Sequence, residues 1–313
     1  MACYVGIDVS QDLLVVAVHG QSDTTQVSNN RTGRKTLRRH LRALKPTRIV
    51  VEGTGGLERP VVVELQEAGL PIVVANPGRV RKLAGALGRV AKTDPIDAAV
   101  IAQFAAVVDL PQPVARTANE RRLHELAVRR AQLVADKQAE GCRAGRMGEV
   151  VQPSIARKCK WLTQEIARLD RALAKLLATD GELAAKAAIV RSAPGVGPTV
   201  LATVLGQLPE LGQLSHKQLA ALVGVAPMAN QSGRHDGARH ITGGRRTVRN
   251  ALFIAALVAS RCDPMMRAFR ARLATRLRST KAILIACAHK LLTILNAMVR
   301  DGTVWAAQPP TSP

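Results

Sequence analysis

The sequence predicts an α/β N-terminal domain with a mixed sheet, a helical coiled-coil middle segment and a mainly α-helical C-terminal domain. Two observations carry this prediction. Short Val-rich runs alternate with amphipathic segments near the N-terminus, which is typical of a sheet covered by helices. Further on, leucines recur at the spacing of a coiled-coil seam. The expected domains are residues 1–114, 115–185 and 186–313.

The N-terminal elements follow from apolar runs separated by turn residues. Cys3 to Asp8 and Leu13 to His19 read as a hairpin, with Thr24 to Ser28 as a third strand. The elements predicted after it are a helix at Arg31 to Leu44 with a cationic outer face, a strand at Arg48 to Glu52, a helix at Leu57 to Ala68 and a strand at Pro71 to Ala75.

The composition indicates a polyanionic partner. The 313 residues include 45 Lys and Arg against 23 Asp and Glu, a formal charge of +22, and the pI is about 11.1. Nucleic acid is the expected partner, and a membrane surface is the alternative. Aromatic residues make up only 2% of the chain, which argues against single-strand binding through base stacking. Arg and Lys contacts to phosphates should therefore dominate.

The cysteines and the apolar runs bear on the compartment. Five cysteines are scattered without C-x-x-C spacing, so neither disulfides nor a zinc site is expected. The longest apolar run, Ala282 to Val299, is broken by His289 and Lys290, which argues against a membrane span. Asp8 comes too early for a signal peptide. We expect a cytoplasmic protein without membrane contact.

Two carboxylates three residues apart occur in the stretch Lys92 to Ala98. Pro95 suits the first position of a helix, with Thr93 or Asp94 as its cap. Asp94 and Asp97 then share one helix face. Taken alone, the pair is explained by helix capping and by the helix dipole.

Two further acids change that interpretation. Asp8 closes the first strand and Glu52 closes the strand after the first helix. Because ligands of open α/β sheets gather at the carboxyl ends of strands, Asp8, Glu52, Asp94 and Asp97 could converge there. Such a cluster repels itself without cations, and two Mg²⁺ ions about 4 Å apart on a phosphodiester are the usual reason to build one. Singly, Asp8 and Glu52 could be turn or solvated residues.

The middle segment consists of two charged helical arms around Pro153. Leu123, Leu126 and Leu133 follow a loose heptad in the first arm, and the second arm has a cleaner seam formed by Leu162, Ile166, Leu169, Leu173 and Leu176. Two interpretations are open. The arms form a helical hairpin packed on its own domain, or they form a long arm that pairs protomers or spans nucleic acid.

The C-terminal part contains two Gly-rich stretches between apolar helices. Residues 192–199 resemble the turn of a helix-hairpin-helix, which offers backbone N–H groups to phosphate, although a plain turn explains them equally. Residues 230–246 are predicted to be a polar loop. Ser232 in this loop is a candidate nucleophile or a simple turn residue. Phosphate contacts are expected from Arg234, Arg239, Arg245, Arg246 and Arg249, and His235 and His240 are either bases or phosphate contacts. A helix at Arg249 to Ser260 should pack on Ala282 to Val299.

An ordered set of motifs resembles a known family. GIDVS at 6–10, VEGTG at 51–55, KTDPIDA at 92–98, GVAP at 224–227, SG at 232–233 and GRRTVR at 244–249 are similar, in this order, to motifs of the DEDD-type insertion-sequence transposases. The resemblance covers nearly the whole chain. A Lys-Arg-Gly-Asn variant of the family is replaced here by Gly243 to Arg246. The resemblance implies an RNase H-like, RuvC-like N-terminal domain and a C-terminal serine-bearing transposase domain.

The resemblance also implies a reaction and partners. Asp8, Glu52, Asp94 and Asp97 would bind Mg²⁺, for which Mn²⁺ can substitute, and Ser232 would form a covalent phosphoserine link to double-stranded DNA. A structured bridge RNA would guide site-specific recombination by base pairing. The protein would act as a dimer or tetramer at the bacterial nucleoid. The alternatives are a RuvC-like Holliday-junction nuclease without a covalent intermediate, and a binding protein without catalysis.

Overall fold

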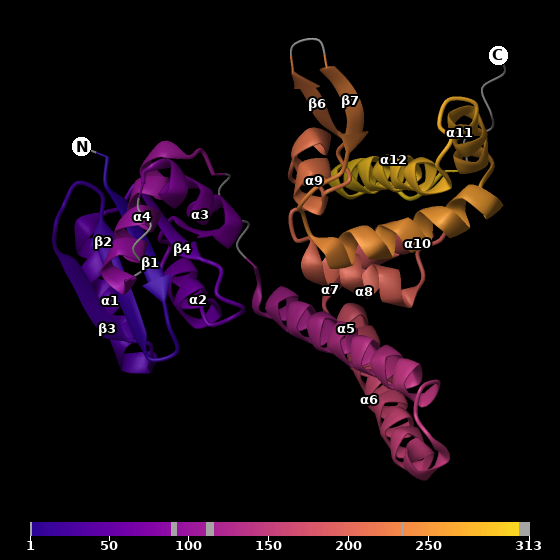
Figure 1. Ribbon diagram of the computed structural model, residues 1–313, viewed down its shortest axis with the longest axis horizontal. Coiled ribbons are helices and arrows are strands. Elements are labelled where there is room, and N and C mark those ends of the chain that lie inside the picture. The colour runs from indigo at the N-terminus through magenta and orange to yellow at the C-terminus, as the bar shows by residue number, and fades with distance from the viewer. Residues whose placement is uncertain (1, 89–92, 111–115, 233–234, 307–313) are drawn as a thin grey trace. The chain divides into compact units, whose positions relative to one another are not determined.

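A computed structural model describes residues 2–88, 93–110, 116–232 and 235–306, with the backbone alone for 229–238 within these ranges. The chain forms two compact units, Met1–Ala115 and Arg116–Pro313, and Figure 1 shows their helices and strands. The helical arms belong to the second unit by packing. The division into three domains stays a prediction.

The N-terminal unit contains a five-stranded sheet in the order β3-β2-β1-β4-β5. Strands β1, β2 and β3 pair antiparallel in succession, whereas β1, β4 and β5 are parallel, so the predicted mixed sheet is confirmed. The strands are β1 (Tyr4–Val9), β2 (Leu13–Val18), β3 (Thr24–Ser28), β4 (Arg48–Glu52) and β5 (Ile72–Ala75).

Helices cover both faces of this sheet. α1 (Arg31–Leu44) and α2 (Arg59–Glu67) contribute to the core on one face. α3 (Pro77–Ala86) and α4 (Asp94–Val107) contribute to the core on the other. α3 was not predicted, because its apolar pattern is short and Val80 is its only buried residue.

In the second unit, two long helices form a hairpin. α5 (Ala118–Ala144) and α6 (Gln152–Thr179) pack against each other, as seen in Figure 1. Leu162, Leu173 and Leu176 of the predicted seam are buried, and Arg130 pairs with Asp170 at 2.5 Å across the two helices. The seam is therefore used within the chain, and the interpretation as an arm that pairs protomers or spans nucleic acid stays a prediction.

The remaining helices form the largest core of the chain. They are α7 (Gly181–Ser192), α8 (Pro198–Gln207), α9 (His216–Val223), α10 (Arg246–Cys262), α11 (Pro264–Ala274) and α12 (Thr280–Asp301). The predicted packing of α10 on α12 is confirmed. By length and composition α12 could cross a membrane, but 50% of its most apolar window is buried inside the unit, as in the core helix of a soluble domain.

The polar stretch predicted as a loop is instead a β-hairpin. β6 (Met228–Ser232) and β7 (His235–His240) pair antiparallel and stand out from the helices beside α9 in Figure 1. The loop prediction was wrong because a two-stranded ribbon can form through backbone hydrogen bonds alone. A ribbon without an apolar face leaves no alternation in the sequence.

Candidate active site

The alternation of side chains along the central strands sets the direction of two predicted acids. The odd-numbered apolar residues of β1 and β4 lie in the core beneath α1 and α2. Gly6 and Val50, by contrast, face α4. Because successive side chains point to opposite faces, Asp8 and Glu52 share the α4 face. Each follows the parallel pair Ile7–Val51 by one residue, so they are neighbours at the strand ends.

A close approach of α4 to β1 brings the other two acids to the same place. A Cβ on Gly6 would overlap the backbone of Ala98 and Ala102 in α4. Gly6 thus lets the helix lie directly on the strand, next to Asp8. α4 begins at Asp94 with Thr93 as its N-cap residue and carries two acids in its first turn. The helix start and the strand ends therefore meet.

The four predicted acids line one cavity of about 400 Å³. Asp8, Glu52 and Asp97 are half-buried, and Asp94 is exposed. Thr54 and Arg81 lie on the same wall. Sequence reasoning missed Arg81 because it missed α3, whose short apolar pattern is a weak helix signal.

The acids suit a divalent cation by residue type. Carboxylate oxygens are the protein ligands that Mg²⁺ takes. Within the described ranges, however, no three His, Cys, Asp or Glu side chains are placed closely enough to hold one ion. The four candidate ligands thus line one pocket, and their side chains must move closer to one another to bind an ion. The exposed Asp94 has the most room to move.

The turn after β4 is held by a carboxylate outside the ligand set. Glu58 Oε2 accepts hydrogen bonds from the backbone N–H groups of Thr54, at 3.0 Å, and Gly56, at 2.8 Å. Glu58 thereby fixes the VEGTGG turn that follows Glu52. The Gly-rich sequence signals the turn, but only the structure shows what stabilises it.

In the second unit, Ser232 is the last residue of β6. Its backbone pairs with that of His235 across the hairpin, and its side chain lies outside the description. Arg234 also lies outside the described residues. Arg239 and His240 are exposed on β7, and Arg246 is exposed at the start of α10. The structure thus places Arg239 on the hairpin that carries Ser232, and Arg246 follows this hairpin in the chain.

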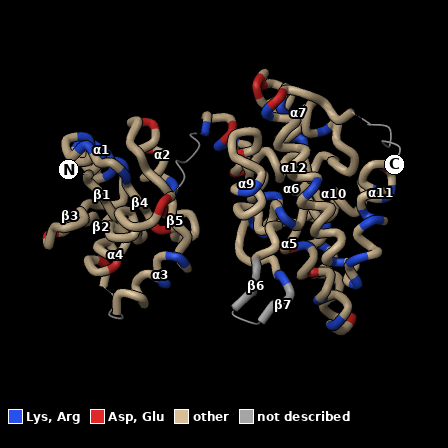
Figure 2. The backbone as a smooth tube through the Cα atoms, turned by 90° about the horizontal axis from the view of Figure 1, so that it is seen from above, with Lys and Arg blue, Asp and Glu red and all other residues tan. Residues whose placement is uncertain are grey.

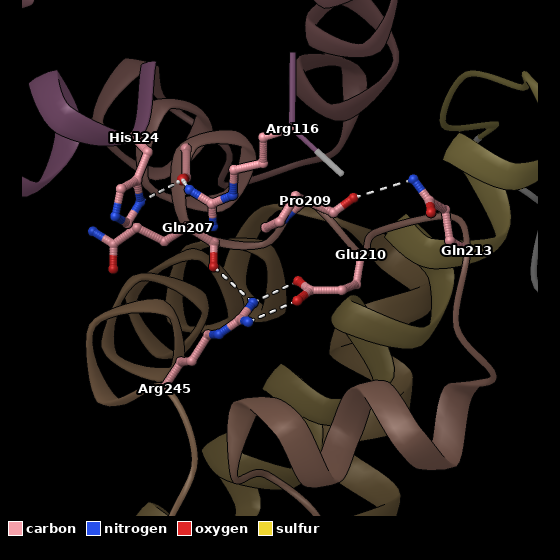
Figure 3. Close-up of polar contacts among 8 residues, drawn as sticks. Arg116, His124, Gln207, Pro209, Glu210, Gln213 and Arg245 are labelled. Carbon is pink, nitrogen blue, oxygen red and sulfur yellow. Dashed lines mark hydrogen bonds and ion pairs between the residues drawn. The ribbon is translucent and has the colours of Figure 1, made fainter. Parts of the chain in front are cut away.

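Arg245 lies at the foot of this hairpin and is paired within the protein. Its guanidinium binds Glu210 through two contacts of 2.5 and 2.7 Å and donates to the Gln207 carbonyl at 2.9 Å, as Figure 3 shows. Burial would raise the pKa of the Glu210 carboxyl, but the hydrogen bonds and charge of Arg245 outweigh it and lower that pKa.

The same region caps the C-terminal end of α8. Arg116 donates to the Gly206 carbonyl at 3.5 Å, and a ring nitrogen of His124 lies 2.9 Å from the same oxygen (Figure 3). Together with Arg245 on Gln207, these side chains engage the carbonyls that a helix end leaves without partners. The start of α5, the end of α8 and the foot of the β6–β7 hairpin are thereby joined.

Arg249 and three glycines also lie at this foot of the hairpin. Arg249 donates to the carbonyls of Gly243, at 2.6 Å, and Gly224, at 3.3 Å. A Cβ on Gly244 would overlap the backbone of Val223 and Gly224, and Gly244 has a φ of 73°. Arg245 and Arg249 therefore have structural partners, and their contact with nucleic acid stays a prediction.

Comparisons with known proteins show two family matches and several relatives. Residues 5–147 match the DEDD transposase model of IS110, described as a transposase, and residues 187–271 match the transposase family of IS116, IS110 and IS902. The pilin gene-inverting protein of Moraxella bovis is 26% identical over 309 residues, 95% of this chain and 96% of that protein.

Two insertion-element proteins are similar over shorter regions. The uncharacterized 43.6 kDa protein of insertion element IS110 from Streptomyces coelicolor is 28% identical over 166 residues, covering 52% of this chain and 40% of that protein. The uncharacterized 42 kDa protein of insertion element IS900 from Mycobacterium paratuberculosis is 36% identical over 126 residues, covering 38% and 31%.

These matches define the class of protein as a transposase, an enzyme that cleaves and rejoins DNA. The chain belongs to the IS110 family of DEDD-type transposases. Asp8, Glu52, Asp94 and Asp97 occur in this D-E-D-D order along the chain. Membership implies an RNase H-like fold for the N-terminal domain and a reaction that depends on a divalent metal, and it excludes a binding protein without catalysis.

Proposed function

We propose that this transposase is a Mg²⁺-dependent, site-specific DNA recombinase of an insertion sequence. The observation that carries the proposal is the convergence of Asp8, Glu52, Asp94 and Asp97 on one cavity. These residues would hold two Mg²⁺ ions, with Mn²⁺ as a substitute. When bound, such ions neutralise charge on the attacking and leaving oxygens of a phosphodiester.

The chain's own residues have distinct tasks in this proposal. Asp8 and Glu52 sit on adjacent central strands and keep their positions, because the sheet fixes them. Asp94 and Asp97 come from the helix start and close the site. Arg81, on the pocket wall, would bind a nonbridging phosphate oxygen and hold the DNA backbone against the acids.

Cleavage of plasmid and branched DNA by the full-length chain tests the metal proposal. We expect cleavage with Mg²⁺ or Mn²⁺, none with EDTA, and none from Asp94→Asn. Isothermal titration should show Mg²⁺ binding that weakens in Asp94→Asn. Full activity of Asp94→Asn, or of the wild type in EDTA, would contradict the assignment.

We further propose that Ser232 supplies the attacking atom. Its Oγ would bond to phosphorus as one P–O bond to the sugar breaks, the serine proton being lost and the departing sugar oxygen taking one up. The reverse attack by a sugar hydroxyl would release Ser232 and rejoin the DNA. Support comes from the resemblance and from the exposed cations Arg239 and Arg246 near the hairpin.

A trapped protein–DNA adduct decides between this route and its alternative. If Ser232 attacks, denaturing gels show a covalent adduct that maps to Ser232 by mass spectrometry and is absent from Ser232→Ala. A RuvC-like junction nuclease that uses water would give no adduct and keep its activity in Ser232→Ala. Asp94→Asn is inactive in both cases, so the acid site and the serine are tested separately.

The guide RNA and the oligomer belong to the same proposal. A charge of +22 suits a protein that holds RNA and DNA duplexes together, with base pairing selecting the sites. A dimer or tetramer would let the acids of one protomer meet the serine of another. Sequencing of co-purified RNA, and light scattering of the chain with and without it, test these two points.

A further inference from the structure

One segment of the second unit concentrates positive charge without any acid. Residues 264–300 contain eight Lys or Arg and no Asp or Glu. The flanking acids are engaged elsewhere: Asp263 caps α11 through the Met266 N–H, and Asp301 pairs with Arg300. Figure 2 shows the Lys and Arg positions along α11. The exposed cations, here named the α11 basic surface, are Arg267, Arg272, Arg276, Arg278 and Lys281.

No cation of the α11 basic surface forms an ion pair with a described residue. Arg267 donates to the Arg261 carbonyl, and Arg272 lies over the Phe269 ring at 5.4 Å. Uncompensated cations repel one another, so an array of this kind costs stability unless an anion binds.

The start of α12 adds to this cost. An acid in the first turn stabilises a helix N-terminus. α12 has no acid there, which is also the case for α1, α2, α3, α6, α8, α9, α10 and α11. Instead Arg278 precedes its N-cap Ser279, and Lys281 lies in the first turn. The positive end of the helix dipole and these two cations repel each other, and a bound phosphate would offset this repulsion.

One side of α11 packs on the core, and the other side is exposed. Met265, Phe269 and Leu273 of α11 pack on the core of the unit. Ala268, Ala271 and Ala274 on the opposite side are exposed. Between the flanking arginines, α11 therefore presents only methyl groups to an approaching nucleic-acid backbone. Phe269 is half-buried beneath Arg272 and Lys290, so it offers no open ring for base stacking.

We propose that the α11 basic surface binds the phosphate backbone of duplex DNA outside the cleavage site. Duplex DNA is chosen because the family cuts and rejoins DNA and because stacking is not available for single strands. The proposal rests on this DNA activity and does not depend on Ser232 or on the metal ions. Contacts with phosphates would give affinity and orientation without sequence preference.

Binding of a labelled DNA duplex by the full-length chain in EDTA, measured by anisotropy over a series of salt concentrations, tests the proposal. EDTA prevents metal-dependent cleavage, so binding is read separately from catalysis. The test variant combines Arg276→Ala, Arg278→Ala and Lys281→Ala, because these side chains form no hydrogen bond or ion pair with the described residues and their removal should leave the fold intact. The slope of log affinity against log salt should fall by about 0.9 for each phosphate that the variant no longer neutralises, roughly 2 to 3 in all.

A matched variant controls for net charge. Arg122→Ala, Arg171→Ala and Lys217→Ala remove three exposed cations from α5, α6 and α9 of the same unit. This control should keep a slope close to that of the wild type. If the slope falls equally in both variants, net charge alone explains the effect and the proposal is wrong. An unchanged slope in the test variant would also overturn the proposal.

An RNA hairpin of equal length separates the nucleic acids. If the test variant loses salt dependence with RNA and keeps it with DNA, the surface binds RNA and the proposal is wrong. Circular dichroism and thermal unfolding of both variants check the fold. Replacing the same three residues so that the charge is kept, with Arg276→Lys, Arg278→Lys and Lys281→Arg, should restore the slope.

Discussion

The two units hold their candidate catalytic residues in different ways. In the N-terminal unit, Asp8 and Glu52 follow paired central strands, and α4 lies directly on β1 at Gly6. In the second unit, Ser232 ends a two-stranded hairpin whose foot is held by Arg245 and Glu210. A site on central strands takes its geometry from the sheet, whereas a site on a hairpin depends on a few interactions at the foot.

The largest effect expected is on the acid pocket. Asp8→Asn should reduce DNA cleavage by on the order of 10²- to 10³-fold or more, because a charged group acting on the transition state is removed. Asp12→Asn is the control, since Asp12 is exposed in the next turn and does not line the pocket. Cleavage rates with Mg²⁺ measure the difference, and equal rates in both variants would remove Asp8 from the site.

The close approach of α4 to β1 can be broken by one methyl group. Gly6→Ala should destabilise the fold by about 1–3 kcal/mol, because the added Cβ overlaps the α4 backbone. The displaced helix should also lower activity. Gly85→Ala is the control, since a Cβ there meets nothing, and it should be neutral or slightly stabilising. Urea unfolding distinguishes them, and a Gly6→Ala protein as stable as wild type would contradict this packing.

The hairpin foot should respond to removal of its ion pair. Arg245→Met leaves Glu210 without its partner and should cost about 1–3 kcal/mol, a value below that of a fully buried pair because Arg245 is 32% exposed. Arg300→Met removes a cation from the exposed pair with Asp301 and should leave unfolding unchanged. If Ser232 is the nucleophile, only Arg245→Met should slow adduct formation, and Arg245→Lys should restore it in part.

The smallest effect concerns pH. The pKa of Glu210 lies below its ordinary value of 4.5, so its stabilisation is complete above about pH 4.5 and is lost as the pH falls through the lowered pKa. Wild type should therefore lose stability in this acid range more steeply than the double variant Glu210→Gln, Arg245→Met. Thermal unfolding from pH 6 to pH 3 measures both slopes, and parallel slopes would show that the pair carries no pH dependence.

Prediction from sequence succeeded where turn residues bound a recognisable strand or helix pattern. The bounds of β3, α1 and β4 match the predicted Thr24–Ser28, Arg31–Leu44 and Arg48–Glu52. α3 and α11 were missed. Their short amphipathic patterns, with Val80 and Met266 as their respective buried residues, give a weak periodic signal.

The partners of the arginines could not be predicted from residue type. A guanidinium can donate hydrogen bonds to a phosphate, a carboxylate or a helix carbonyl, so the residue type alone does not show which of them it binds. Sequence alone could not show that Arg245 binds Glu210 and Gln207 or that Arg249 binds Gly243 and Gly224. It also passed over the α11 basic surface, whose importance depends on which cations are exposed and unpaired.

The sequence by itself determined the class of this protein and the order of its acids. Period-two alternation and helix-start signals are local properties, so strand faces, the α4 start and the positions of Asp8, Glu52, Asp94 and Asp97 could be read from the chain. Only the tertiary structure decided that Gly6 lets α4 bring these acids to one cavity and that the arginines divide between structural and exposed positions. The physical reason is that both outcomes depend on interactions between residues far apart in the chain, which no local pattern records.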